Sequence, residues 1–226
     1  MFFMKSSGAV PRRVAHFMHV YPELRTEPVL DVGCGVNTVH LRYFAPGSIG
    51  IDGAEVQPPE GRSFLRWNFS ADIRTQLEEN ALQSTFQFVW CQDVFEHVLA
   101  PHEFLLNLRR SIKLDGYLFL DVPLVNKLGT YAESRNNPLN YFRGFLSQDH
   151  VNFFTFNTLR YTAEYAGFEC VDWYSPFFKG WKRPLRFGFE PVVVMVFRPI
   201  SDFNYGPKAY KELVDGHLKW KGLISP

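Results

Sequence analysis

The chain has 226 residues, of which 46% are hydrophobic and 21% charged, and its formal net charge is +1. This length and composition are those of one globular domain with a substantial core. A charge this close to zero gives no overall attraction to nucleic acid or to an anionic membrane, although a local patch would suffice for either. We expect no nucleic-acid partner. The three cysteines are far apart and odd in number, which argues against a disulfide framework and a zinc site.

The chain contains no apolar run of the length that a membrane span or the core of a signal peptide requires. Unpaired cysteines are the usual state in a reducing compartment. We therefore expect a cytoplasmic protein with no membrane span.

Apolar strand-like runs alternate with helical patterns in the first half of the chain. The pattern predicts strands over 28–32, 49–51, 63–66, 86–91 and 117–122, and helices over 14–21, 37–44 and 101–112. A further helix is expected over 155–166, followed by strands over 168–173 and 192–197. Such alternation favours parallel pairing. The expected fold class is α/β, a Rossmann-like doubly wound sheet that is mostly parallel with an antiparallel last strand and has helices on both faces.

The most specific pattern is Val29-Leu30-Asp31-Val32-Gly33-Cys34-Gly35. An apolar strand ends here in an acid and two glycines, which describes a tight turn whose backbone a ligand can approach closely. The next predicted strand ends in Asp52, 21 positions after Asp31. A carboxylate at that place can accept hydrogen bonds from both hydroxyls of a ribose.

These segments resemble the class I S-adenosylmethionine-dependent methyltransferases. Two later segments, Cys91-Gln92-Asp93-Val94-Phe95-Glu96-His97-Val98 and His150-Val151-Asn152-Phe153-Phe154-Thr155, resemble a branch that includes ubiquinone-biosynthesis and sugar O-methyltransferases. The resemblance covers roughly residues 28–170. It departs at Asn37, where the family commonly has a third glycine, although Asn tolerates a left-handed backbone. Thr38 stands where a dinucleotide fingerprint needs glycine, which argues against a nicotinamide enzyme.

The resemblance implies S-adenosylmethionine as cofactor and S-adenosylhomocysteine as product. Asp31 would meet the amino group, Asp52 the ribose hydroxyls, and Asn68 the adenine, although a loop residue or helix cap is nearly as good an account of Asn68. The implied cofactor contacts are Asp31, Gly33, Cys34, Gly35, Asp52, Asn68, Cys91, Gln92 and Asp93. We expect Cys34 and Cys91 to be small packing groups rather than nucleophiles, because nothing nearby obviously lowers a thiol pKa.

Two histidines are candidates for removing a proton from the methyl acceptor. Imidazole suits this step near neutral pH. His150 is the first candidate for a general base; alternatively it pins the preceding insertion by hydrogen bonding, which is about as good an account. For His97 and Glu96 a helix-start network is favoured. Some members of the resembling branch hold a divalent metal at positions that correspond to Asp93, Glu96 and His97, but helix capping is favoured here and we predict no metal site.

The resemblance leads us to expect one domain over 1–226. Its parts are an N-terminal helical segment (1–27), a cofactor-binding half (28–122), a substrate-side insertion (123–153), a C-terminal helix with strands (154–200) and a tail helix (201–226). A basic loop holding Lys182 and Arg183 could grip a phosphate, although a solvated hairpin is the favoured account.

The leading functional hypothesis is transfer of a methyl group to an oxygen or nitrogen of a small-molecule acceptor. One alternative is a catalytically silent methyltransferase-like scaffold or regulator that binds the cofactor or a partner protein. Another is a protein or RNA methyltransferase, for which the chain offers only the short basic loop as a charged groove. The sequence leaves a homodimer open.

Overall fold

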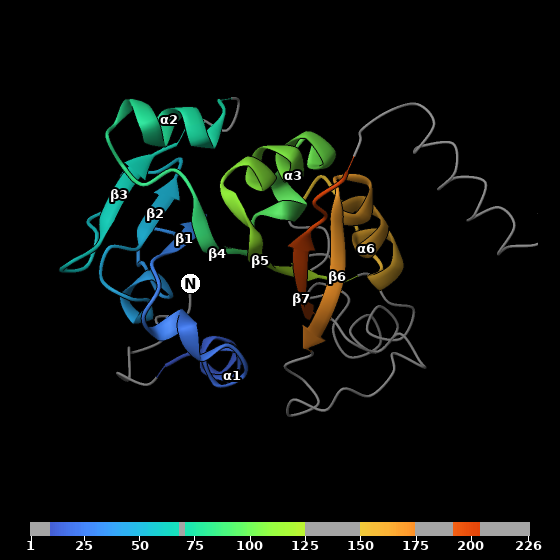
Figure 1. The fold of residues 1–226 in the computed structure, drawn as a ribbon, viewed down its shortest axis with the longest axis horizontal. Coiled ribbons are helices and arrows are strands. Elements are labelled where there is room, and N and C mark those ends of the chain that lie inside the picture. The colour runs from blue at the N-terminus through green and yellow to red at the C-terminus, as the bar shows by residue number, and fades with distance from the viewer. Residues whose placement is uncertain (1–9, 68–70, 125–149, 175–191, 204–226) are drawn as a thin grey trace, which may run out of the picture.

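A computed structural model describes the chain except residues 1–9, 68–70, 125–149, 175–191 and 204–226. Its centre is one seven-stranded sheet with the strand order β3-β2-β1-β4-β5-β7-β6 (Figure 1). The strands are β1 (Val29–Val32), β2 (Ile49–Asp52), β3 (Ser63–Arg66), β4 (Phe86–Gln92), β5 (Ile112–Pro123), β6 (Phe168–Tyr174) and β7 (Val192–Pro199). The order reverses at β1, where an open α/β sheet forms its ligand crevice.

The first five strands are parallel, and β7 lies antiparallel between β5 and β6. This arrangement confirms the predicted fold class, including the antiparallel last strand. β1 and β4 are short and buried, as parallel strands covered on both faces should be. The carboxyl ends of β1, β2, β4 and β5 therefore meet at one edge of the sheet.

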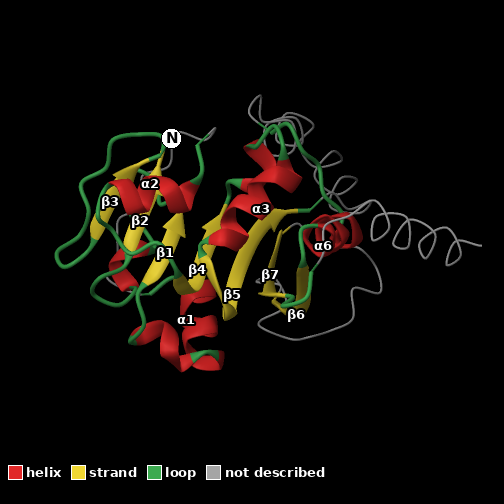
Figure 2. Cartoon of the chain, turned by 45° about the horizontal axis from the view of Figure 1, so that its top comes forward, coloured by secondary structure: helices red, strands yellow, loops and turns green. Residues whose placement is uncertain are grey.

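Helices cover both faces of the sheet and create two apolar cores (Figure 2). On one face, α1 (Arg12–Val20) packs Phe17 against Trp90 of β4 and Phe119 of β5. The opposite face carries α2 (Ile73–Glu79), α3 (Pro101–Arg110) and α6 (Phe156–Tyr165). Their apolar stripes bury Leu77, Leu105 and Leu159 completely.

The helix predicted over 37–44 is wrong. The chain makes turns there and only a short 3₁₀ helix, η2 (Leu41–Tyr43). The cause lies at Thr38, whose φ of 45° is left-handed and cannot continue a right-handed helix. The helix predicted over 101–112 also ends early, because Ile112 already begins β5, five residues before the predicted start of that strand.

Two other helices start at residues whose side chains cap them. Asp72 accepts a hydrogen bond from the Thr75 amide at the start of α2. Thr155 and Thr158 form a capping box at the start of α6. In the described part of the chain, no helix is long and apolar enough to span a membrane.

Several expectations lie outside the described residues: the adenine contact at Asn68, most of the insertion over 123–153, the basic loop with Lys182 and Arg183, and the tail helix. They stay predictions.

Candidate cofactor and acceptor site

The glycine turn after β1 is built for close approach of a ligand. Gly33 and Gly35 have φ angles of 71° and 65°, in the left-handed region. A Cβ added to Gly33 would lie 2.0 Å from Cγ2 of Val94, so a side chain there would force Val94 to move. A Cβ added to Gly35 would meet nothing within 4 Å. The turn is therefore closed on the protein side at Gly33 and open at Gly35.

Asp52, at the end of β2, holds that turn in place. Its Oδ2 accepts a hydrogen bond of 2.9 Å from the Gly35 amide, and its Oδ1 accepts one of 2.9 Å from the Ala54 amide. Each carboxylate oxygen has a second lone pair, so Asp52 can also accept from ribose hydroxyls. The residue predicted to bind ribose is thus fixed directly beside the open glycine.

Asp31 is buried in β1, with 1% of its surface exposed. Its Oδ2 has no hydrogen-bond partner among the described residues. Burial raises the pKa of Asp31 to about 8; a backbone hydrogen bond from Leu41 lowers it and the charge of Asp52 raises it. A buried carboxyl group in this state gains most from a positively charged partner, and the predicted amino group of the cofactor is one.

Cys91 shows how many acids gather at this edge. The pKa of its thiol is raised well above the usual value, first by burial and then by the charges of Glu96, Asp31, Asp121 and Asp93. Burial likewise raises the pKa of Cys34 to about 12. Neither thiol forms a thiolate near neutral pH, which agrees with the prediction that both are packing groups.

Asp121 and Arg13 are two members of this edge that the sequence analysis missed. Arg13 reaches from α1 and donates a hydrogen bond to Oδ2 of Asp121 near the end of β5. Asp121 is fully buried, and burial raises its pKa to about 7 even though Arg13 lowers it. An acid near the end of an apolar strand was an available signal for Asp121. Arg13, 108 positions away in the chain, offered none.

Asp93 follows β4 with a φ of 51°, which is rare for a residue other than glycine. Its amide donates a hydrogen bond of 3.1 Å to the Asp121 carbonyl, and its carboxylate accepts one of 3.1 Å from Gln92. Gln92 and Asp93, two of the implied cofactor contacts, are therefore held together at the end of β4, beside β5. Strained backbone of this kind often marks a functional position.

The predicted His97 and His150 meet around Glu96 and form what we call the acid–histidine cluster. Nε2 of His97 lies 3.8 Å from Oε1 of Glu96, and Nε2 of His150 lies 3.9 Å from the same oxygen. One nitrogen or oxygen from each residue lies within 4.8 Å of the others. Burial raises the pKa of Glu96 to about 7, while the charge of Asp93 raises it and that of His97 lowers it. Asp93 is not part of this group.

Backbone contacts fasten the chain beside this cluster. The amides of Val151 and Asn152 donate hydrogen bonds of 2.9 and 3.0 Å to the Glu96 carbonyl. The Asn152 side chain adds one of 2.5 Å to the Val98 carbonyl. Phe154 then stacks on Phe95, with ring centroids 4.8 Å apart. These contacts hold the segment that contains His150 against the chain around Glu96, and sequence reasoning had not singled out Asn152.

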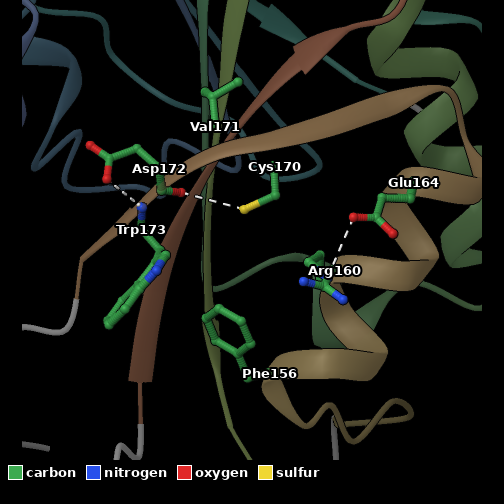
Figure 3. A pocket seen from close by; sticks show the side chains of 7 residues that line it. All are labelled: Phe156, Arg160, Glu164, Cys170, Val171, Asp172 and Trp173. Carbon is green, nitrogen blue, oxygen red and sulfur yellow. Dashed lines mark hydrogen bonds and ion pairs between the residues drawn. The ribbon is translucent and has the colours of Figure 1, made fainter. Parts of the chain in front are cut away.

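A separate cavity of about 340 Å³ lies between α6 and β6 (Figure 3). Phe156 and Trp173 form an aromatic wall, and Arg160 makes an ion pair of 3.4 Å with Glu164. None of the predicted site residues lines it.

Comparison with known proteins decides the family. A family model described as "Methyltransferase domain" matches residues 8–172, which is most of the chain. The chain belongs to this methyltransferase family. Its cofactor is S-adenosylmethionine, and the open turn at Gly35, the fixed Asp52 and the buried Asp31 fit that molecule. The match includes the glycine turn, the acid–histidine cluster and α6.

The ubiquinone biosynthesis O-methyltransferase of Glaesserella parasuis serovar 5 (strain SH0165) is 28% identical over 120 residues. The alignment covers 49% of this chain and 51% of that protein, so the chain spans about half the length of the curated relative it matches.

Solved structures share the fold. An S-adenosylmethionine-dependent methyltransferase from Mesorhizobium loti has a TM-score of 0.57 at 12% identity, covering 83% of this chain and 98% of that one. The 1,6-didemethyltoxoflavin-N1-methyltransferase of Burkholderia thailandensis, solved with 1,6-didemethyltoxoflavin and S-adenosylhomocysteine, has a TM-score of 0.52 at 16% identity. That alignment covers 86% of this chain and 80% of the other.

Proposed function

We propose that this protein transfers a methyl group from S-adenosylmethionine to an oxygen or nitrogen of a small-molecule acceptor. The observation that carries the proposal is the acid–histidine cluster, which stands at the same edge of the sheet as the glycine turn. The names of two similar proteins support the acceptor class, since one is an O-methyltransferase of ubiquinone biosynthesis and the other an N1-methyltransferase of 1,6-didemethyltoxoflavin.

The cofactor would be held by groups on both sides of β1. The Gly35 backbone and Asp52 would hold the ribose, and Asp31 the amino group. Arg13 uses one nitrogen on Asp121, and its other guanidinium nitrogens have no hydrogen-bond partner among the described residues, so they suit a carboxylate. When bound, the cofactor supplies a methyl group on a sulfonium, which makes that methyl electrophilic.

His150 would take the proton that the acceptor loses. Its side chain is 15% exposed, against 37% for His97, so His150 is the more protected from water. The nearby Glu96 carboxyl group would stabilise the imidazolium that forms. Hydrogen bonds of Val151 and Asn152 hold the backbone next to His150 against the chain around Glu96.

The test is turnover of a panel of phenols, catechols and amines by wild type and by His150→Gln. We expect the variant to lose between about 10² and 10⁴ of the turnover rate, the usual effect of removing a general base. Its affinity for S-adenosylhomocysteine and its melting temperature should stay within error of the wild type. His19→Gln, at the exposed end of α1, is the matched control.

Full turnover by His150→Gln would remove the proposed base. Binding of S-adenosylhomocysteine without turnover of any acceptor would favour the scaffold alternative.

The proposal also includes a cytoplasmic location, the absence of a nucleic-acid partner, a single domain with the boundaries given above, and the predicted adenine contact at Asn68. Sedimentation would decide between a monomer and a homodimer.

A further inference from the structure

The cavity between α6 and β6, which we call the edge cavity, has the size of a small-molecule site. Its volume of about 340 Å³ falls at the lower end of the range usual for such sites, about 300–1,000 Å³. β6 is the outermost strand of the sheet, so β4, β5 and β7 separate the edge cavity from the glycine turn. The residues that line it are Phe156, Arg160 and Glu164 of α6 and Cys170, Val171, Asp172 and Trp173 of β6 (Figure 3).

A β-bulge in β6 turns Trp173 toward the edge cavity. The pairing of β6 with β7 shifts between Cys170 and Asp172. In a regular strand, residues three apart point to opposite faces of the sheet. Here Cys170 and Trp173 both pack against the core on the α6 side, whereas Tyr174 packs in the core beneath α1. Bulges at sheet edges commonly re-aim a side chain, and this one supplies an aromatic wall of the cavity.

Arg160, in the middle of the cavity wall, has hydrogen-bond donors to spare. Its Nε lies 3.4 Å from Oε1 of Glu164, but this buried nitrogen makes no hydrogen bond within the described part of the chain. The guanidinium carbon lies 4.9 Å from the ring centroid of Tyr161. A guanidinium carries five N–H donors in a planar fork, and that fork matches a carboxylate. Arg160 is therefore the group in this cavity that suits an anionic ligand.

Other titratable groups around the cavity bring little opposing charge. Burial raises the pKa of Glu164, although the charge of Arg160 lowers it. Cys170 is neutral, because burial raises the pKa of its thiol to about 11. The Asp172 carboxylate points away from Arg160 in Figure 3. Burial, and next the charge of Asp172, raise the pKa of Tyr21 to about 12, which agrees with a carboxylate directed toward α1.

We propose that the edge cavity binds an aromatic carboxylate, with its ring against Phe156 and Trp173 and its carboxylate on Arg160. The two aromatic rings have centroids 5.6 Å apart at an interplanar angle of 81°, so they offer a ligand ring one face and one edge. Two parallel hydrogen bonds from a guanidinium hold a carboxylate in a fixed orientation. The site is separate from that of the proposed methyl transfer, and its ligand contacts the first turn of α6.

The test is titration of the full chain with 2-naphthoate, a flat aromatic carboxylate, observed through the NMR signals of the indole N–H groups. The chain has five Trp residues, and Trp173→Phe identifies the signal of Trp173 by its loss. We expect 2-naphthoate to shift this signal and to leave that of the fully buried Trp90 in place. The neutral 2-naphthamide and the cationic 2-naphthylmethylamine should bind at least tenfold more weakly than 2-naphthoate.

Arg160→Gln should weaken the binding of 2-naphthoate at least tenfold and leave that of 2-naphthamide within twofold, since only the carboxylate loses its partner. Arg198→Gln is the matched control, because Arg198 of the neighbouring β7 is also ion-paired, with Glu169, but does not line the cavity. Its affinity for 2-naphthoate should equal that of the wild type.

If Arg160→Gln does not fold, the shift at Trp173 and the order of the three probes in the wild type still decide. The inference is overturned by the absence of that shift, by amide or amine binding as tight as that of 2-naphthoate, or by unchanged binding to folded Arg160→Gln. None of these results bears on the proposed methyl transfer, whose test is turnover.

Discussion

The turn after β1 differs from the residues at the ends of β4 and β5, which we call the acceptor edge because the methyl acceptor is proposed to bind there. The difference is in how completely the folded chain satisfies their carboxyl and amide oxygens. At the turn, Asp52 uses both carboxylate oxygens on backbone amides within two short stretches of chain. At the acceptor edge, Glu96, Asp121 and Gln92 each keep a buried oxygen without a partner among the described residues. The first region is complete as folded protein, whereas the second retains an energetic cost that a ligand can remove. The proposed ribose contact Asp52 and the residues near the proposed acceptor thus differ in how completely the folded chain satisfies their oxygens.

The largest expected effect is a loss of stability when a side chain is added to the glycine turn. Gly33→Ala would place a methyl group 2.0 Å from Val94 at a φ of 71°, and should cost about 3 kcal/mol of the free energy of unfolding. Gly35→Ala meets no atom within 4 Å and should cost only about 1 kcal/mol, from its left-handed backbone alone. Urea denaturation of both variants measures the difference. Equal costs would show that the packing of Val94 does not define the turn.

The next effect concerns affinity rather than folding. Asp52→Ala removes the acceptor of the Gly35 and Ala54 amides together with the proposed ribose ligand. We expect the affinity for S-adenosylhomocysteine to fall about 100-fold, since two or more charge-assisted hydrogen bonds are lost. Calorimetric titration measures it, with Asp115→Ala, in the turn region at the exposed start of β5, as the control. An unchanged affinity would place the ribose elsewhere.

A third prediction concerns how the free energy of unfolding depends on pH. Asp31, Glu96 and Asp121 have pKa values of about 8, 7 and 7 in the folded protein, all above their ordinary values of 3.8 to 4.5. The folded protein therefore binds more protons than the unfolded chain between about pH 4 and pH 8. The free energy of unfolding should fall as the pH rises through that window.

Urea denaturation at pH 5.5, 7.0 and 8.5 checks this slope, and Asp31→Asn should make it shallower. A saturating concentration of S-adenosylmethionine should reduce the loss, because its positive groups stabilise the charged carboxylates. Stability that rose with pH across this window would contradict the account of buried acids.

The smallest expected effect tests the attachment of the acceptor edge. Asn152→Ala removes the hydrogen bond to the Val98 carbonyl and should cost about 1 kcal/mol. Hydrogen exchange at the Val151 and Asn152 amides should speed up, because both donate to the Glu96 carbonyl that this side chain helps to hold. Thr155→Ala, which weakens the capping box of α6, is the control: it should lose similar stability without faster exchange at those amides.

The same contrast explains how much the sequence predicted. The strands, their direction and the placement of Asp31, Gly33, Gly35 and Asp52 follow from local patterns of apolar residues and glycines. The helix predicted over 37–44 was wrong because the helical spacing of apolar residues continues through Thr38, which has a left-handed backbone. Local patterns report faces and turns, but a single backbone angle within them is set by the surrounding fold.

The acceptor edge was only partly predictable, since it is assembled over long distances in the chain. His97 and His150 were both expected near the acceptor, but their meeting around Glu96 depends on backbone bonds across more than 50 residues. Arg13 reached the same edge only because α1 packs Phe17 onto β4 and β5. Neither the meeting of the histidines around Glu96 nor the approach of Arg13 corresponds to a residue spacing that can be recognised in the sequence.

The position of β7 has a consequence for how this chain is made. β7 is the last strand among the described residues, yet it lies between β5 and β6 and pairs with both. While the ribosome is still producing residues before 192, β5 has no neighbour on one side and β6 has no sheet to join. Leu118 and Leu120, fully buried in the finished protein, then lie on an open strand edge that invites pairing with other chains. We therefore expect the chain to aggregate more readily before β7 has been made than afterwards.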